Sequence, residues 1–103
     1  MVVRFIYEFN TPDFILPTNL TTIEESAFEG DTMSVVYIPD NCNSIADFAF
    51  KDCNNLIQIR IPENCLISGN AFEGCDKVFI FGTAGSPAEA FCQTHDNCVF
   101  IEE

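Results

Sequence analysis

The side chains best suited to chemistry in this sequence are six cysteines and a single histidine. Cys92 lies three residues before His95, so a helix would place both side chains on one face, where an imidazole can activate a thiol. Such a nucleophile also needs a group that orients the imidazole and donors that stabilise an oxyanion, and no motif supplies either. A cysteine-dependent hydrolase is therefore the remotest hypothesis, and no catalytic residue is predicted.

The spacing of the cysteines argues against a metal centre. They are Cys42, Cys53, Cys65, Cys75, Cys92 and Cys98. No two are separated by two residues, as zinc and iron–sulfur motifs require, so we expect no metal or other cofactor. Cys92 and Cys98 flank the expected end of a helix and are the pair we expect to form a disulfide if the chain meets an oxidising compartment.

Composition restricts the class of protein and its partners. The chain has 103 residues, of which 48% are hydrophobic and eleven are Phe, so it fits one domain and not a disordered acidic tail. Its formal net charge of −12 opposes binding to nucleic acid or anionic lipid. No apolar run reaches the roughly 20 residues of a membrane-spanning helix. Residues 1–9 carry Arg4 and Glu8 and lack a signal-peptide cleavage site, so the compartment stays open, the cytoplasm included.

Two motifs recur along the chain with nearly the same period. The first is Ala27-Phe28, Ala49-Phe50 and Ala71-Phe72, at intervals of 22 residues. The second is Pro-x-Asn followed by an apolar residue, which begins at Pro17, Pro39 and Pro62, at intervals of 22 and 23. Because a unit of this length cannot bury its own apolar face, the period predicts a solenoid of about three stacked coils of 22–23 residues.

Each repeat is expected to supply one strand, a proline turn and a compact helical or 3₁₀ turn. The predicted strands are Val35–Ile38, Ile57–Ile61 and Val78–Phe81. The Phe of each Ala-Phe motif is expected to enter one common column in the core. Cys42 matches Cys65 and Cys53 matches Cys75 in the repeat, and we interpret these four as small buried hydrophobes in a ladder rather than as disulfides.

The two ends of the stack must be covered. At the C-terminus, Ser86 as N-cap, then Pro87 and Glu89, predict a helix whose buried stripe is Ala88, Phe91, Cys92 and His95. A final strand is expected over 98–101, so that residues 82–103 form a cap, 17–81 the repeats and 1–16 an N-terminal strand or cap. Val2–Phe9 is the expected strand there. If it leaves an unpaired edge, the chain would self-associate through residues 1–17.

The outward positions of the strands carry the candidate binding residues. Tyr37, Arg60 and Phe79 alternate with core positions and are expected to form a stripe across three coils. Exposed aromatics beside an arginine are typical of protein-binding hot spots. The stripe has an alternative interpretation, in which loops cover it or it serves only cross-strand packing.

The best-conforming repeats are Leu56-Ile57-Gln58-Ile59-Arg60-Ile61-Pro62 and Ala71-Phe72-Glu73-Gly74-Cys75. In these motifs the chain resembles the BspA-like (Treponema pallidum type) leucine-rich repeats, over residues 14–81. The resemblance implies a right-handed leucine-rich-repeat solenoid from a cell-surface or secreted protein, commonly adhesive and seldom catalytic. The leading hypothesis is thus a non-enzymatic interaction module for a protein or glycan ligand. The alternative is a structural spacer or fragment of a larger repeat protein.

Overall fold

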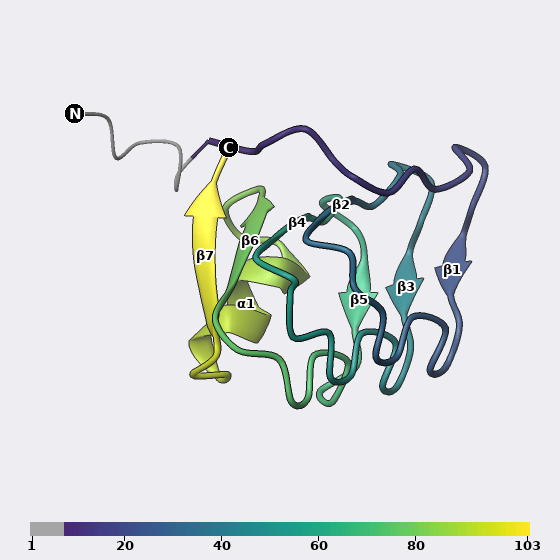
Figure 1. Cartoon of the computed structure of the whole chain (residues 1–103). Helices are drawn as coiled ribbons and strands as arrows, with labels where there is room; N and C mark the ends of the chain where they lie inside the picture. Colours follow the sequence, from purple (N-terminus) through teal and green to yellow (C-terminus); the bar gives the residue numbers. More distant parts are fainter. Residues whose placement is uncertain (1–7) are drawn as a thin grey trace.

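Two parallel sheets run side by side through the computed structural model, which describes residues 8–103 (Figure 1). The larger sheet has the order β2 (Val35–Tyr37), β4 (Gln58–Arg60), β6 (Val78–Gly82) and β7 (Cys98–Glu102). The smaller sheet has the order β1 (Thr22–Ile23), β3 (Ser44–Ile45) and β5 (Leu66–Ile67). The chain alternates between the two sheets, so the fold is a β-solenoid of about four turns, as predicted.

Each full coil holds a second strand that the sequence did not indicate. The strands of the smaller sheet are only two residues long, too short for an alternating pattern to stand out. Their inward residues are equivalent in the repeat, and Ile23 and Ile45 are each 1% exposed. From the larger sheet, Val36, Ile59 and Ile80 face them and are fully buried. The apolar core therefore lies between the two sheets and continues from coil to coil.

A column of aromatic rings runs along this core. Its members are Phe14, Phe28, Phe50, Phe72 and Phe91, with centroids 5.3, 5.5, 5.3 and 5.7 Å apart. The rings of Phe50 and Phe72 are nearly parallel, at 5°, because successive coils place them in the same rotamer and environment. The predicted single column of the three Ala-Phe motifs is confirmed.

The turns that carry these rings are joined between coils as well. The thiols of Cys53 and Cys75 donate hydrogen bonds of 3.1 Å to the carbonyl oxygens of Phe28 and Phe50, one coil earlier. In the last coil, Asn97 continues this ladder with a bond of 3.2 Å from its side-chain amide to Phe72 O. The repeat cysteines are buried as expected, and they also satisfy backbone acceptors in an otherwise apolar region.

The C-terminal end is covered by α1 (Pro87–Gln93), which packs against β5, β6 and β7 (Figure 1). The predicted helix is present, but its capping differs from the prediction. Ser86 is the N-cap residue, yet its hydroxyl is buried and makes no hydrogen bond. The Glu89 carboxylate instead accepts a hydrogen bond of 2.7 Å from the backbone amide of Gly85, one residue before the expected donor. This end of the smaller sheet is therefore closed by helix packing rather than by a capping box.

A left-handed residue is required at the same corner of each coil. Gly30 and Gly74 occupy it with φ of 73° and 81°, but Asp52 occupies it with φ of 60° in the middle coil. Positive φ costs a non-glycine residue on the order of 1–2 kcal/mol, less for Asp than for most. We therefore predict that Asp52→Gly raises the free energy of unfolding by up to about 1 kcal/mol in urea denaturation followed by circular dichroism.

The matched control for this prediction is Gly74→Ala. A Cβ atom at Gly74 would lie 2.0 Å from the Asp52 carboxylate in addition to requiring positive φ. Gly74→Ala should therefore lower stability. A lower urea midpoint for Asp52→Gly than for the parent chain would contradict the prediction.

Candidate interaction surface

The register of the larger sheet separates the three predicted stripe residues. Tyr37 pairs with Arg60, and Arg60 pairs with Phe81, whereas Phe79 pairs with Gln58 one row away. The prediction of a single row was therefore wrong, although Phe79 does lie on the same outer face, two residues before Phe81 along β6. The reason is a change in coil length, since 23 residues separate Tyr37 from Arg60 but only 21 separate Arg60 from Phe81.

The N-terminal segment 8–16, here called the strap, crosses this outer face from β7 to β2 (Figure 1). The ring of Phe9 packs edge-on against Phe81 at 5.5 Å and against Tyr37 at 6.3 Å between centroids. Phe81 is consequently only 1% exposed, although its position in the strand is an outward one. Tyr37 keeps 38% of its surface exposed, and Phe79 is half-buried.

Polar contacts fix the strap at two points. At one, the buried side chain of Gln58 donates a bond of 3.0 Å to Glu8 O and accepts one of 2.8 Å from the Asn10 amide. At the other, the Asp13 carboxylate accepts hydrogen bonds from the Val35 amide at 3.0 Å and from the Ser34 hydroxyl at 2.8 Å. The bond from the Val35 amide is the main cause that lowers the pKa of Asp13 below its usual value.

The strap also bears on the predicted N-terminal edge. The expected strand Val2–Phe9 lies outside the described residues over 1–7, and Glu8 and Phe9 are not in a strand. Phe14 forms a parallel bridge with Val36, and the Asp13 amide donates to Val35 O, so the strap covers part of the edge of β2. Self-association through residues 1–17 stays a prediction.

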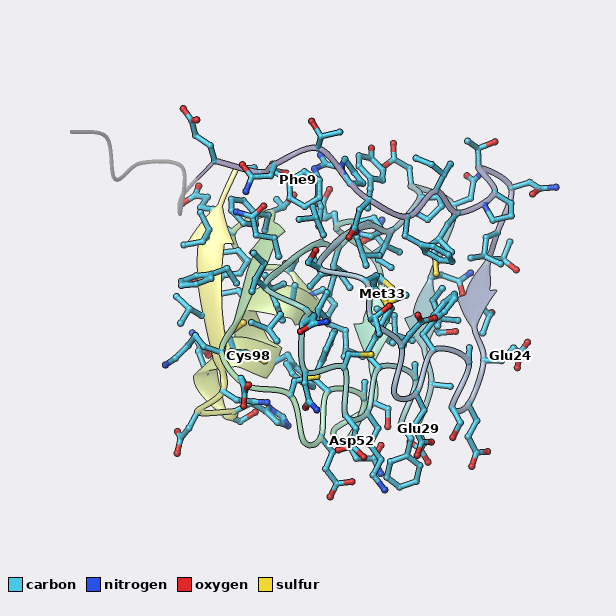
Figure 2. The ribbon with its side chains drawn as sticks, in the orientation of Figure 1. Phe9, Glu24, Glu29, Met33, Asp52 and Cys98 are labelled. Carbon is cyan, nitrogen blue, oxygen red and sulfur yellow. The ribbon has the colours of Figure 1, made fainter. Side chains whose placement is uncertain are left out.

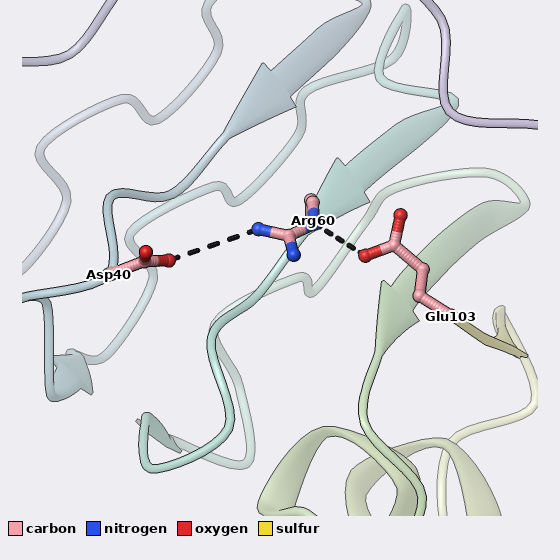
Figure 3. Close-up of polar contacts among 3 residues, drawn as sticks. All are labelled: Asp40, Arg60 and Glu103. Carbon is pink, nitrogen blue, oxygen red and sulfur yellow. Dashed lines mark hydrogen bonds and ion pairs between the residues drawn. The ribbon is translucent and has the colours of Figure 1, made fainter.

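Arg60 is engaged within the molecule (Figure 3). Its Nε donates a hydrogen bond to the Glu103 carboxylate, and its Nη1 lies 3.9 Å from Asp40 Oδ1. The guanidinium also lies 5.0 Å from the centroid of the Tyr37 ring. Partial burial by itself lowers the pKa of Arg60, but the hydrogen bond and charge of Glu103 outweigh it and raise that pKa. Arg60 thus holds Tyr37 in place and joins β4 to the C-terminal strand.

A groove opens beside Tyr37, between the strap and the corner that follows β2. Its volume is about 560 Å³. It is lined by Pro12, Phe14, Ile15, Leu16, Thr18, Tyr37, Pro39, Asp40 and Asn41. Ile15 is 82% exposed, while its neighbours Phe14 and Leu16 turn toward the core. Sequence analysis missed Ile15, and the signal that could have found it is the alternation within Phe14-Ile15-Leu16.

The thiols and the histidine make separate contacts. Burial raises the pKa of Cys65 to about 12 and that of Cys75 to about 11. Cys92 and Cys98 are close enough to hydrogen-bond, and this bond lowers the pKa of Cys92 and raises that of Cys98. The ring of His95 stacks on Phe91 at 3.8 Å. Its Nε2 lies 2.7 Å from Gly69 O, so the printed contacts of His95 lead to the cap and not to Cys92.

The stacked parallel coils, the aromatic column and the outer sheet face define a leucine-rich-repeat solenoid. A family model described as the BspA type leucine rich repeat region (6 copies) matches residues 4–86, and the chain belongs to this family. Repeats of this family usually mediate protein interactions and are typically non-enzymatic. No curated protein and no solved structure matched the chain. Within residues 8–103, no helix has the length and apolarity needed to cross a bilayer.

Gln58 offers a direct test of the strap. Gln58→Leu keeps the size of the side chain but removes the hydrogen bonds to Glu8 O and from the Asn10 amide. We expect the free energy of unfolding to fall by about 1–3 kcal/mol, because two strap groups lose their partner. Hydrogen exchange of the Asn10 amide should accelerate more than that of Val36 in the sheet. Equal acceleration at both sites would show that the whole fold, not the strap, depends on Gln58.

Thiol reactivity should follow burial and the shifts in pKa. Alkylation by iodoacetamide at pH 8, read by mass spectrometry of peptides, should modify half-buried Cys92 first. Cys65 and Cys75 should react only on unfolding, since their pKa values leave almost no thiolate at this pH.

The same peptides report on oxidation. Under mild oxidant, Cys92 and Cys98 are the pair expected to form a disulfide. A disulfide between Cys42 and Cys65 instead, or early alkylation of Cys75, would contradict this assignment.

Proposed function

We propose that this chain is a non-enzymatic module that binds a protein ligand through the uncovered part of the larger sheet's outer face and the adjoining groove. The observation that supports this most is the exposure of Tyr37 and Ile15 on a rigid scaffold, next to a groove of about 560 Å³. Phe79 extends the apolar surface along β6. Arg60 contributes by holding the Tyr37 ring, since its charge is already balanced by Glu103 and Asp40.

A protein ligand fits this surface better than a glycan, because the groove is mostly apolar and aromatic while its polar side chains lie on one side. Adhesion at a cell surface is the finer form of the proposal, and it is supported by the family alone. The second candidate is a structural spacer, and the strap favours it: a spacer would cover its own stripe with its own residues, as Phe9 covers Phe81.

An unbiased selection separates the two candidates. A phage-displayed library of random peptides is panned against the immobilised chain, and enriched peptides are measured by fluorescence polarisation. We expect Tyr37→Ala or Phe79→Ser to weaken the enriched peptides by about tenfold or more, as truncation of a central aromatic does. The matched control is Leu66→Ser, which changes an aliphatic residue 65% exposed on the smaller sheet.

The spacer alternative has its own outcome in this experiment. It predicts no enrichment, or peptides that bind the variants and the parent chain equally. Circular dichroism of each variant verifies that the fold is retained.

A further inference from the structure

We infer that the groove beside Tyr37 accepts an extended segment of a partner protein that contains prolines and carries lysine or arginine next to them. This inference rests on the proposed function and names the class of ligand for one part of that surface. It is carried by three observations on the described residues: the lining of the groove, the rigidity of its aromatic wall and the charge around it.

The lining favours proline. Two prolines, Tyr37, Phe14 and Ile15 present flat or branched apolar groups along an open groove. An ordinary extended peptide would bury unpaired amide N–H groups against such a wall, at a cost of about 1–3 kcal/mol each. Proline has no N–H, and a polyproline II segment is already extended, so aromatic-lined grooves are a recurrent site for it.

The aromatic wall is rigid before any ligand binds. Phe9 packs edge-on against Tyr37 at 6.3 Å between centroids, and the Arg60 guanidinium lies 5.0 Å from the ring centroid. The side-chain amide of Asn41 donates a hydrogen bond of 3.3 Å to Thr18 O, which joins the two sides of the groove. Binding would therefore order few protein side chains, and this raises the affinity available from a small contact area.

Charge favours a basic ligand. Asp40 lines the groove with a side chain 81% exposed, and the nearest described cation, Arg60, is paired with Glu103 as well as with Asp40. The chain as a whole has a net charge of −12. Further carboxylates, including those of Glu29 and Asp52, lie across the coil from Phe9 (Figure 2). Lysine or arginine beside the prolines would meet Asp40 and gain from the field of the whole chain.

The same charge argues against a second copy of the chain as the occupant. Two copies would each bring a net charge of −12 to the contact, and the exposed side chains at the groove include no cation that could balance Asp40 of the other copy. Like charges in an interface oppose association and are found where a partner is to be rejected.

The probe for the test is the fluorescein-labelled peptide Lys-Pro-Pro-Leu-Pro-Pro-Lys-Arg, titrated with the full chain by fluorescence polarisation. Two matched peptides are compared, the acidic Glu-Pro-Pro-Leu-Pro-Pro-Glu-Glu and the basic Lys-Gly-Ser-Leu-Gly-Ser-Lys-Arg. We expect the basic proline peptide to bind about tenfold or more tightly than either. Ile15→Ser and Tyr37→Ala should weaken it by about fivefold or more. Asp40→Asn should weaken it and reduce its dependence on salt.

The control Leu66→Ser should leave binding of the basic proline peptide unchanged, because Leu66 is exposed on the other sheet. Equal binding of the Gly-Ser peptide would show a purely electrostatic contact and overturn the inference. If the display selection yields ligands that depend on Phe79 while the proline peptide does not bind, the proposed function stands and this inference fails. If neither experiment yields a ligand, both fail.

Sedimentation velocity supplies the remaining outcome. A concentration-dependent dimer that Ile15→Ser abolishes, together with no binding of the proline peptide, would assign the groove to a second copy and overturn the inference. A monomer at the concentrations used for the titration is the expected result.

Discussion

Pairing between successive coils is the constraint on which the rest of this structure depends. No coil can bury its own apolar residues, so each one uses its neighbours as the other half of its core. The pairing extends beyond the two sheets: the Phe28 amide donates to Ala49 O and the Phe50 amide to Ala71 O, both at 2.8 Å. Because the backbone is fixed on all sides in this way, side chains at equivalent positions must stack, and the phenylalanine column follows.

The same dependence explains why the two ends of the stack differ. At the C-terminus, α1 supplies Phe91 to the column while β7 extends the larger sheet, so one coil is replaced by two separate devices. At the N-terminus, the strap supplies Phe14 to the column and then crosses the outer face to reach Phe81 with Phe9. One segment thus closes the first coil and also decides which part of the sheet face stays exposed.

The parts of the fold that repeat could be predicted from the sequence, because recurrence at 22 residues has few structural explanations. The column of Phe28, Phe50 and Phe72 follows directly from that period. The row containing Arg60 could not be predicted, since the two-residue difference in coil length lies in a loop and shifts Phe81 into the place expected for Phe79. The strap could not be predicted either. Its contacts, such as Gln58 with Asn10, join positions 48 residues apart and leave no periodic signal.

Arg60 illustrates how residue type and residue role diverge. An arginine beside exposed aromatics has the composition of a hot spot, yet this guanidinium spends its hydrogen bond on Glu103 and its face on Tyr37. In a chain with four basic residues and sixteen acidic ones, a buried or half-buried cation is more useful for joining the chain's own carboxylates than for meeting a partner. Recognition then falls to the ring that Arg60 holds still, and selectivity falls to the unbalanced carboxylates around it, which favour partners of opposite charge.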